Sequence, residues 1–238
     1  MALPKSEGRP RLDPESPPLK KSQSSLPPTR PWTQLESCIP PAMSILESRL
    51  GSQAAWVDPA SLPKYGDASE IAGNAPDHVK QLTNNTLGAY GVGNVDAFAY
   101  SVGRKIRLVE VNTDQRGDKW EATAVAELIV SKDMLNGAGM MHGGCMCYII
   151  DNCASFPLVA LGLMQGVNGV GVSQALNVFF HAPCPLGAAL RITSTSVTLG
   201  GRIMTSRCEV ANKVSGRMVA SALLSKMQPN AKRLPYED

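Results

Sequence analysis

The sequence predicts an α+β protein in which one long helix lies against a curved antiparallel sheet of about six strands. Stretches with the alternation typical of strands occur on both sides of a single apolar stretch of helical length. Short clusters of turn-forming residues separate neighbouring strands, which favours antiparallel connections.

Proline dominates the beginning of the chain. Ten of the 18 prolines precede Met43, and few apolar residues accompany them. Because proline removes a backbone donor and this composition buries little apolar surface, we expect residues 1 to about 43 to be disordered. The chain is therefore expected to divide into a largely disordered, Pro-rich extension over residues 1–73 and a folded domain over residues 74–238.

The folded domain is expected to begin with a helix near residues 77–88, in "PDHVKQLTNNTLGAYG", with Asn74 or Asp77 near its start. A fainter helical pattern, "ILESRLGSQAAWV", precedes it. Two strands follow in "KIRLVEVN" (105–112) and "KWEATAVAELIV" (119–130). Alanines share one face of the second strand with Leu128, and small residues there let a bulky element pack closely.

Four further strands are expected after the apolar stretch. We expect them to form a meander, because short breaker clusters separate them. Their sequences are "VGVSQALNVFFHA", "AALRITSTSVTL", "RIMTSRCEVANK" and "RMVASALLSKMQ".

The apolar stretch from Cys145 to Met164 is long enough to cross a membrane. However, Asp151 near its middle would cost at least a few kcal/mol in a bilayer, and Pro157 would kink the span. The amphipathic strands on both sides also need one face toward water and one toward a core. We therefore expect a buried helix and no membrane span.

Basic residues dominate the C-terminal half. Between His142 and Pro235 the only acids are Asp151 and Glu209, against eight basic residues. This balance suits an anionic partner. The region shows no recognised nucleic-acid-binding motif, so we expect no nucleic-acid partner, and a ligand that carries a few phosphates fits the charge.

The cysteines and histidines form no pattern of metal ligands. The six cysteines contain no CxxC pair, and only three histidines are present. Reduced thiols, no metal and no cofactor are therefore expected. The N-terminus has no apolar core of signal-peptide length. We expect a cytoplasmic protein, with a mitochondrial location as the alternative.

The segment "NGAGMMHGGCMCYIIDN" (136–152) suggests acyl transfer. Gly143 and Gly144 at a helix start would expose backbone N–H groups, whose hydrogen bonds to a carbonyl oxygen strengthen as negative charge develops on that oxygen. Asp151 follows about 12 Å further along the helix, too far to act on the same carbonyl within one subunit. If two chains pair with these helices antiparallel, Asp151 of one could meet Gly143 of the other. The plain alternatives are a tightly packed turn at the glycines and a structural role for the acid.

The same segment resembles the N-x-x-G-x-x-H-G-G-x-x-x-x-x-x-D motif of hotdog-fold acyl-CoA thioesterases of the phenylacetate-degradation type, which include the acyl-CoA thioesterase 13 group. "GVSQALNVFFHAPCPLG" resembles the family's segment after its central helix. The likeness covers roughly residues 74–228. It implies a hotdog fold that hydrolyses an acyl-CoA to a carboxylic acid and free CoA.

The resemblance also implies roles for single residues. The Gly143 N–H would polarise the thioester carbonyl, and Asp151 from the partner subunit would be the base or the nucleophile. Asn136 would hold the carbonyl or a water, and Ser173 would orient the attacking water. The stretch between Asp151 and Ser173 looks several residues longer than in the small animal relatives, which changes the expected depth of the acyl pocket.

Substrate binding is expected at the helix start and in the basic strands. His142 would support the loop, and Gly144 would lie beside it. Lys213, Arg217 and Lys226 are candidates to contact the phosphates of CoA, with a solvated surface charge as the alternative for each. Family members pair two chains edge to edge, so the resemblance implies an acyl-CoA substrate and a homodimer or homotetramer.

Two other functions fit the same fold. One is a non-catalytic acyl-CoA-binding or regulatory module, although a binder has no need of a buried carboxylate. The other is hydratase or dehydratase chemistry, which needs an acid/base pair, and His142 is the histidine near the helix start.

Overall fold

The computed structural model describes residues 58–228. Its helical segments are η2 (Pro59–Ser61), α2 (Asp77–Thr86), the π-helical η3 (Leu87–Val92), α3 (Tyr100–Gly103), η4 (Lys132–Met134) and α4 (Gly143–Met164). Its strands are β1 (Arg107–Arg116), β2 (Lys119–Ile129), β3 (Val172–Phe180), β4 (Ala189–Leu199), β5 (Ile203–Asn212) and β6 (Met218–Met227). The predicted disorder up to residue 43 and the helical pattern "ILESRLGSQAAWV" lie outside the described residues.

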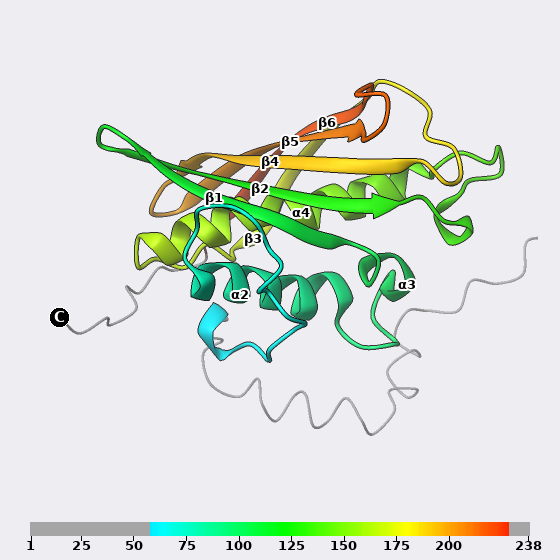
Figure 1. Cartoon of the computed structure of the whole chain (residues 1–238). Helices are drawn as coiled ribbons and strands as arrows, with labels where there is room; N and C mark the ends of the chain where they lie inside the picture. The colour runs from blue at the N-terminus through cyan, green and yellow to red at the C-terminus, as the bar shows by residue number, and fades with distance from the viewer. Residues whose placement is uncertain (1–57, 229–238) are drawn as a thin grey trace, which may run out of the picture. The chain divides into compact units, whose positions relative to one another are not determined.

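The strands form one antiparallel sheet in the order β1-β2-β4-β5-β6-β3, and α4 lies against one face of it (Figure 1). The helix expected near residues 77–88 is α2, which packs beside α4. The predicted fold class, a long central helix packed on a six-stranded antiparallel sheet as in the hotdog fold, is confirmed. Residues from 58 onward belong to the same compact unit as the sheet, so this unit includes residues ahead of Asn74.

The expected meander of the last four strands is wrong for β3. Strand β3 pairs with β6 at the edge of the sheet, whereas β4 pairs with β2 and β5. The connection over residues 181–188 contains Pro183 and Pro185, and prolines cannot donate the hydrogen bonds that close a tight hairpin.

The connection between β3 and β4 instead bonds to other parts of the domain as it passes the start of α4. These bonds run from the His181 N–H to the Val219 carbonyl, from the Met141 N–H to the Cys184 carbonyl and from the Gly187 N–H to the Val130 carbonyl. They tie the start of β6, the start of α4 and the end of β2 to one segment. The crossing therefore holds in place the chain around the first turn of α4.

Helix α4 is buried because β2 offers it small side chains. Ala122, Ala124 and Ala126 of β2 are 0%, 1% and 1% exposed, and Ile149 and Ile150 of α4 are both 0% exposed. By length and composition α4 could cross a membrane, but 67% of its most apolar window is buried inside the domain. This burial is the pattern of a core helix, as the sequence predicted.

The loop after α4 approaches the helix so closely that only glycine fits at residue 169. A Cβ on Gly169 would lie 2.0 Å from the Leu158 carbonyl oxygen. We expect Gly169→Ala to lower the free energy of unfolding by roughly 1–3 kcal/mol, because the main chain must move. Equilibrium unfolding in urea measures this change. In the control Gly201→Ala the added Cβ meets nothing within 4 Å, and equal losses in both variants would contradict the close approach.

Candidate active site

The start of α4 presents an unpaired backbone donor at Gly143. Gly143 is the first helical residue, and His142 is the N-cap. The Nδ1 of His142 accepts the Gly144 N–H at 2.9 Å, so the second donor expected at Gly144 is already occupied. The Gly143 N–H has no acceptor among residues 58–228. Because it lies at the positive end of the helix dipole, it suits an oxygen that carries or develops negative charge.

A cavity of about 460 Å³ lies at this helix start. Gly143, Asn136, Phe180 and His181 line it. The Phe180 ring comes within 3.5 Å of the position that a Cβ on Gly143 would occupy. Most of the other lining residues are apolar, among them Met140, Met146 and Val219. The cavity therefore combines an apolar wall with a backbone donor.

Asn136 is held by its own loop. Its Oδ1 accepts the Ala138 N–H at 2.9 Å and the Met140 N–H at 3.2 Å. The Nδ2 group has no hydrogen-bond partner in the part of the chain that the structure describes. The fixed side chain can therefore offer its amide N–H groups to a ligand in the cavity.

Asp151 lies in a second polar cluster, two turns along α4. It is half-buried, and its Oδ1 accepts the Ser173 hydroxyl at 2.6 Å. This bond fixes the carboxylate and leaves Oδ2 available. Ser173 donates its hydroxyl proton to the acid, so its oxygen is free to accept a hydrogen bond from a water.

The structure thus separates the predicted catalytic residues into two sets. Asn136 and Gly143 share the cavity, whereas neither Asp151 nor Ser173 lines it. Strand β3 connects the two sets: Ser173 is its second residue and Phe180, in the cavity wall, is its last.

Lys226 is an unexpected member of the Asp151 cluster. It is 7% exposed, and its Nζ donates to the Ser155 hydroxyl at 2.8 Å. The Ser155 hydroxyl donates to the Asp151 carbonyl at 2.8 Å, and Lys226 lies opposite Ser173 in the sheet. Burial lowers the pKa of Lys226 to about 8, and the charge of Asp151 partly opposes this shift. The burial argues against the phosphate contact expected for this lysine.

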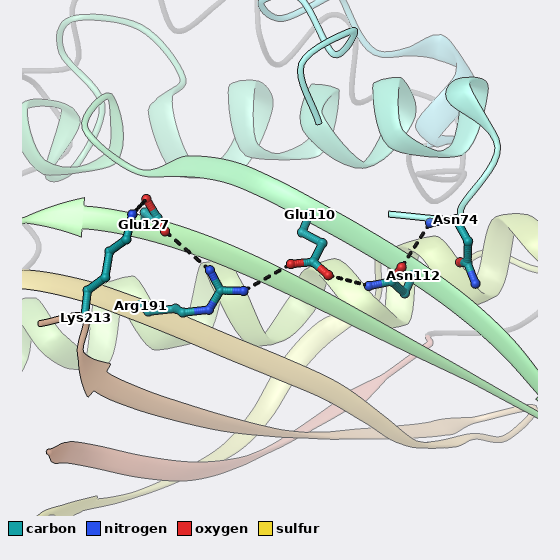
Figure 2. Close-up of polar contacts among 6 residues, drawn as sticks. All are labelled: Asn74, Glu110, Asn112, Glu127, Arg191 and Lys213. Carbon is teal, nitrogen blue, oxygen red and sulfur yellow. Dashed lines mark hydrogen bonds and ion pairs between the residues drawn. The ribbon is translucent and has the colours of Figure 1, made fainter. Parts of the chain in front are cut away.

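Lys213 belongs to a network of charges across strands β1, β2 and β4 (Figure 2). Its Nζ lies 2.7 Å from Glu127, and Arg191 bridges Glu127 and Glu110 at 3.4 and 3.1 Å. The network continues from Glu110 through Asn112 to Asn74. Because these groups are partly exposed, each pair contributes little stability. Arg217 is exposed in the turn between β5 and β6, which also contains Lys213. Phosphate binding by Lys213 and Arg217 stays a prediction.

Sequence reasoning missed His181 as a residue of the cavity. Its Nε2 lies 2.8 Å from the Ser221 hydroxyl. The sequence signal was weak, because a single histidine after a strand has no spacing that indicates chemistry. Only the crossing of the β3–β4 connection past α4 brings it beside Gly143.

A segment that carries several of these residues is similar to a known family. Residues 138–219 match the family model of the Thioesterase superfamily. The predicted resemblance to this superfamily is confirmed. The matched segment includes Gly143, Asp151 and Ser173, whereas Asn136 precedes it and Lys226 follows it.

The chain is distantly similar to acyl-coenzyme A thioesterase 13 of Homo sapiens. The two sequences are 26% identical over 96 residues, which cover 40% of this chain and 66% of the relative. The chain thus spans just under two thirds of the length of this curated relative.

Solved structures of thioesterase-superfamily proteins also align with the chain. The crystal structure of zebra fish thioesterase superfamily member 2 gives a TM-score of 0.48 at 17% identity and covers 62% of this chain and 98% of its own. A hypothetical thioesterase with coenzyme A from Streptococcus pneumoniae gives a TM-score of 0.40 at 20% identity and covers 49% of this chain and 84% of its own.

The buried ammonium of Lys226 predicts a pH-dependent difference in stability. Its pKa is lowered from 10.5 to about 8 in the folded chain. At pH 7 both states carry the proton, so the full cost of burial is present. Between about pH 8 and 10.5 the unfolded chain holds a proton that the folded chain lacks, so wild type should gain about 3 kcal/mol relative to Lys226→Met.

Urea unfolding of both proteins at pH 7 and at pH 10 measures this gain. Lys119→Met, at an exposed position at the start of β2, is the matched control. A stability difference between wild type and Lys226→Met that does not change with pH would contradict the burial of a charged lysine.

Proposed function

We propose that this chain hydrolyses an acyl-CoA to a carboxylic acid and free CoA, in a site that two copies of the chain complete. One observation carries the proposal. The free donor of Gly143 and the carboxylate of Asp151 lie at opposite ends of β3, and the outer edge of this strand is unpaired among the described residues.

An exposed edge strand is a template for pairing with another chain. Strand β3 is exposed along most of its length, with Phe179 64% and Phe180 57% exposed. If two copies of β3 pair antiparallel around Leu176, Ser173 of one subunit lies opposite Phe179 of the partner. The pairing then brings the partner's Asp151 toward the cavity, so each cavity gains the acid that it lacks.

The composite site has the parts that hydrolysis of a thioester needs. The carbonyl oxygen lies at the Gly143 N–H, where the helix dipole and the Asn136 amide stabilise the oxyanion. The partner's Asp151 then attacks the carbonyl carbon or removes a proton from a water that does so. Ser173 holds the carboxylate in either case. The apolar wall of the cavity receives the acyl group.

The match to the Thioesterase superfamily supports the reaction class, and the similarity to acyl-coenzyme A thioesterase 13 supports an acyl-CoA substrate. The homodimer follows from the split site, and a homotetramer is compatible with it. A cytoplasmic location stays a prediction, and imaging of the tagged full-length chain tests it.

Hydratase chemistry is a second candidate because the cavity contains a histidine. His142 uses its Nδ1 to cap α4, so this chemistry would fall to His181. An assay with an enoyl-CoA separates the two functions, because hydration removes the double bond and releases no thiol.

Single substitutions in each residue set test the reaction. We expect Asp151→Asn to lower kcat/KM for thiol release from acyl-CoA by roughly 10²–10⁴-fold, because the base or nucleophile is lost. Gly143→Pro removes the free N–H at a position where proline suits a helix, and the loss should be roughly 10²–10³-fold. His142 has φ −67° and ψ 134°, which a following proline accepts.

Gly143→Ala is the control, because it keeps the N–H and its Cβ makes an ordinary 3.5 Å contact with Phe180. It should be far more active than Gly143→Pro. Full thiol release by folded Asp151→Asn protein would end the proposal.

Mixed dimers test whether the site is shared. When Asp151→Asn and Gly143→Pro chains are co-expressed, we expect roughly a quarter of wild-type activity, because half of the dimers are mixed and each of these has one intact site. Two affinity tags isolate the mixed dimers, and the rate of thiol release is measured. Mixed dimers as inactive as their parents would show that each subunit works with its own acid.

A further inference from the structure

His181 places a titratable ring in the cavity, and the proposed hydrolysis leaves this ring without a role. The N–H groups of His181 and Ala182 both donate to the Val219 carbonyl, at 2.8 and 3.2 Å, which holds the backbone in place. The ring Nε2 lies 2.8 Å from the Ser221 hydroxyl. Its Nδ1 has no hydrogen-bond partner within residues 58–228. One ring nitrogen is therefore anchored and the other is available to a ligand.

The pairing of His181 with Ser221 suits a ring that changes its protonation state. A serine hydroxyl can donate or accept a hydrogen bond. It can accept from the Nε2–H of an imidazolium, and it can still accept from that N–H in the neutral ring after the proton on Nδ1 has left. The ring can thus lose a proton from Nδ1 and stay anchored.

The proposed hydrolysis also requires an acid that gives a proton to the leaving thiolate, and none has been assigned so far. A simple alkyl thiol has a pKa of about 8.5, so a departing thiolate is helped by an acid at neutral pH. Two other titratable groups near the helix start are poorly suited. His142 already accepts a hydrogen bond at Nδ1. Cys184 lines the cavity, but burial raises the pKa of its thiol and makes it a weaker acid.

We propose that His181 is the general acid that protonates the departing thiolate of CoA, with Ser221 as its positioning residue. The inference rests on the proposed function. When the tetrahedral intermediate collapses, the oxyanion electron pair re-forms the carbonyl and the C–S electron pair goes to sulfur. The proton on Nδ1 passes to sulfur and gives the free thiol. The neutral imidazole, exposed on the surface, regains a proton from water.

A comparison of leaving groups tests the assignment. Acyl-CoA and two small thioesters with the same acyl group are used, one of N-acetylcysteamine and one of 4-nitrothiophenol. The nitro-aryl thiolate is a weak base and departs without a proton. We expect His181→Gln to lower kcat/KM for acyl-CoA and for the alkyl thioester by roughly 10²-fold, and for the aryl thioester by less than about threefold.

Two serines on β6 provide the second variant and its control. Ser221→Ala should show the same leaving-group pattern with a smaller loss. Ser225 lies on the same strand, and its hydroxyl makes no hydrogen bond among the described residues. Ser225→Ala should leave all three rates unchanged. Thermal unfolding and size-exclusion chromatography show whether each variant keeps its fold and assembly.

The outcomes separate this inference from the proposed function. An equal loss of activity on alkyl and aryl thioesters would overturn the role of His181, because a structural defect does not depend on the leaving group. Unchanged hydrolysis by His181→Gln would overturn it too, and would leave the proposed function standing. If wild type hydrolyses none of the three substrates, the proposed function fails and the inference fails with it.

Discussion

The burial of α4 against the sheet is the constraint on which the site depends. The small side chains of β2 bring the helix close, and the close approach at Gly169 stops the helix from sliding. Gly143 and Asp151 are therefore fixed on one rigid rod, about 12 Å apart along its axis. No change of side-chain rotamer within one subunit closes that gap. The helix that positions both groups so firmly also prevents them from acting together in one chain.

In the proposed dimer the strand order resolves this conflict. Because β3 crosses to the edge beside β6, the strand next to both residue sets is the one that remains open to another chain. When a strand pairs antiparallel with its own copy, the start of one strand lies beside the end of the other. Groups that lie at opposite ends of β3 within one chain would then lie close together between two chains. The same crossing brings the connection after β3 past the helix start, which places His181 and Phe180 in the cavity.

Local patterns predicted the elements well, because alternation and helix length depend on neighbouring residues. The strands, the long helix and the small face of β2 were all predictable in this way. The pairing of β3 was not, since a short breaker cluster does not say whether the next strand is adjacent. The prediction of a free N–H at Gly144 was wrong, because the Nδ1 of His142 accepts that N–H. No sequence rule indicates this hydrogen bond.

The burial of Lys226 was not predictable from the sequence either. In the sequence it reads as one more charge on a basic half, and a lysine on a strand is most often solvated. Whether it is buried depends on Ser155 and Asp151, which belong to a helix far away in the chain. Only the packing of α4 on the sheet brings them together, so no local pattern could have assigned its place.

One feature of this domain works against its stability. The ammonium of Lys226 is buried at a cost in free energy, and an apolar side chain at position 226 would fit the core with less penalty. Such departures from the rules of folding tend to occur at functional sites, where the surrounding structure holds them in place. Lys226 lies beside Asp151, at the end of β3 opposite the cavity. A role of Asp151 in the proposed shared site explains why a charged group is kept there, whereas a purely structural role leaves the cost of burying Lys226 unexplained.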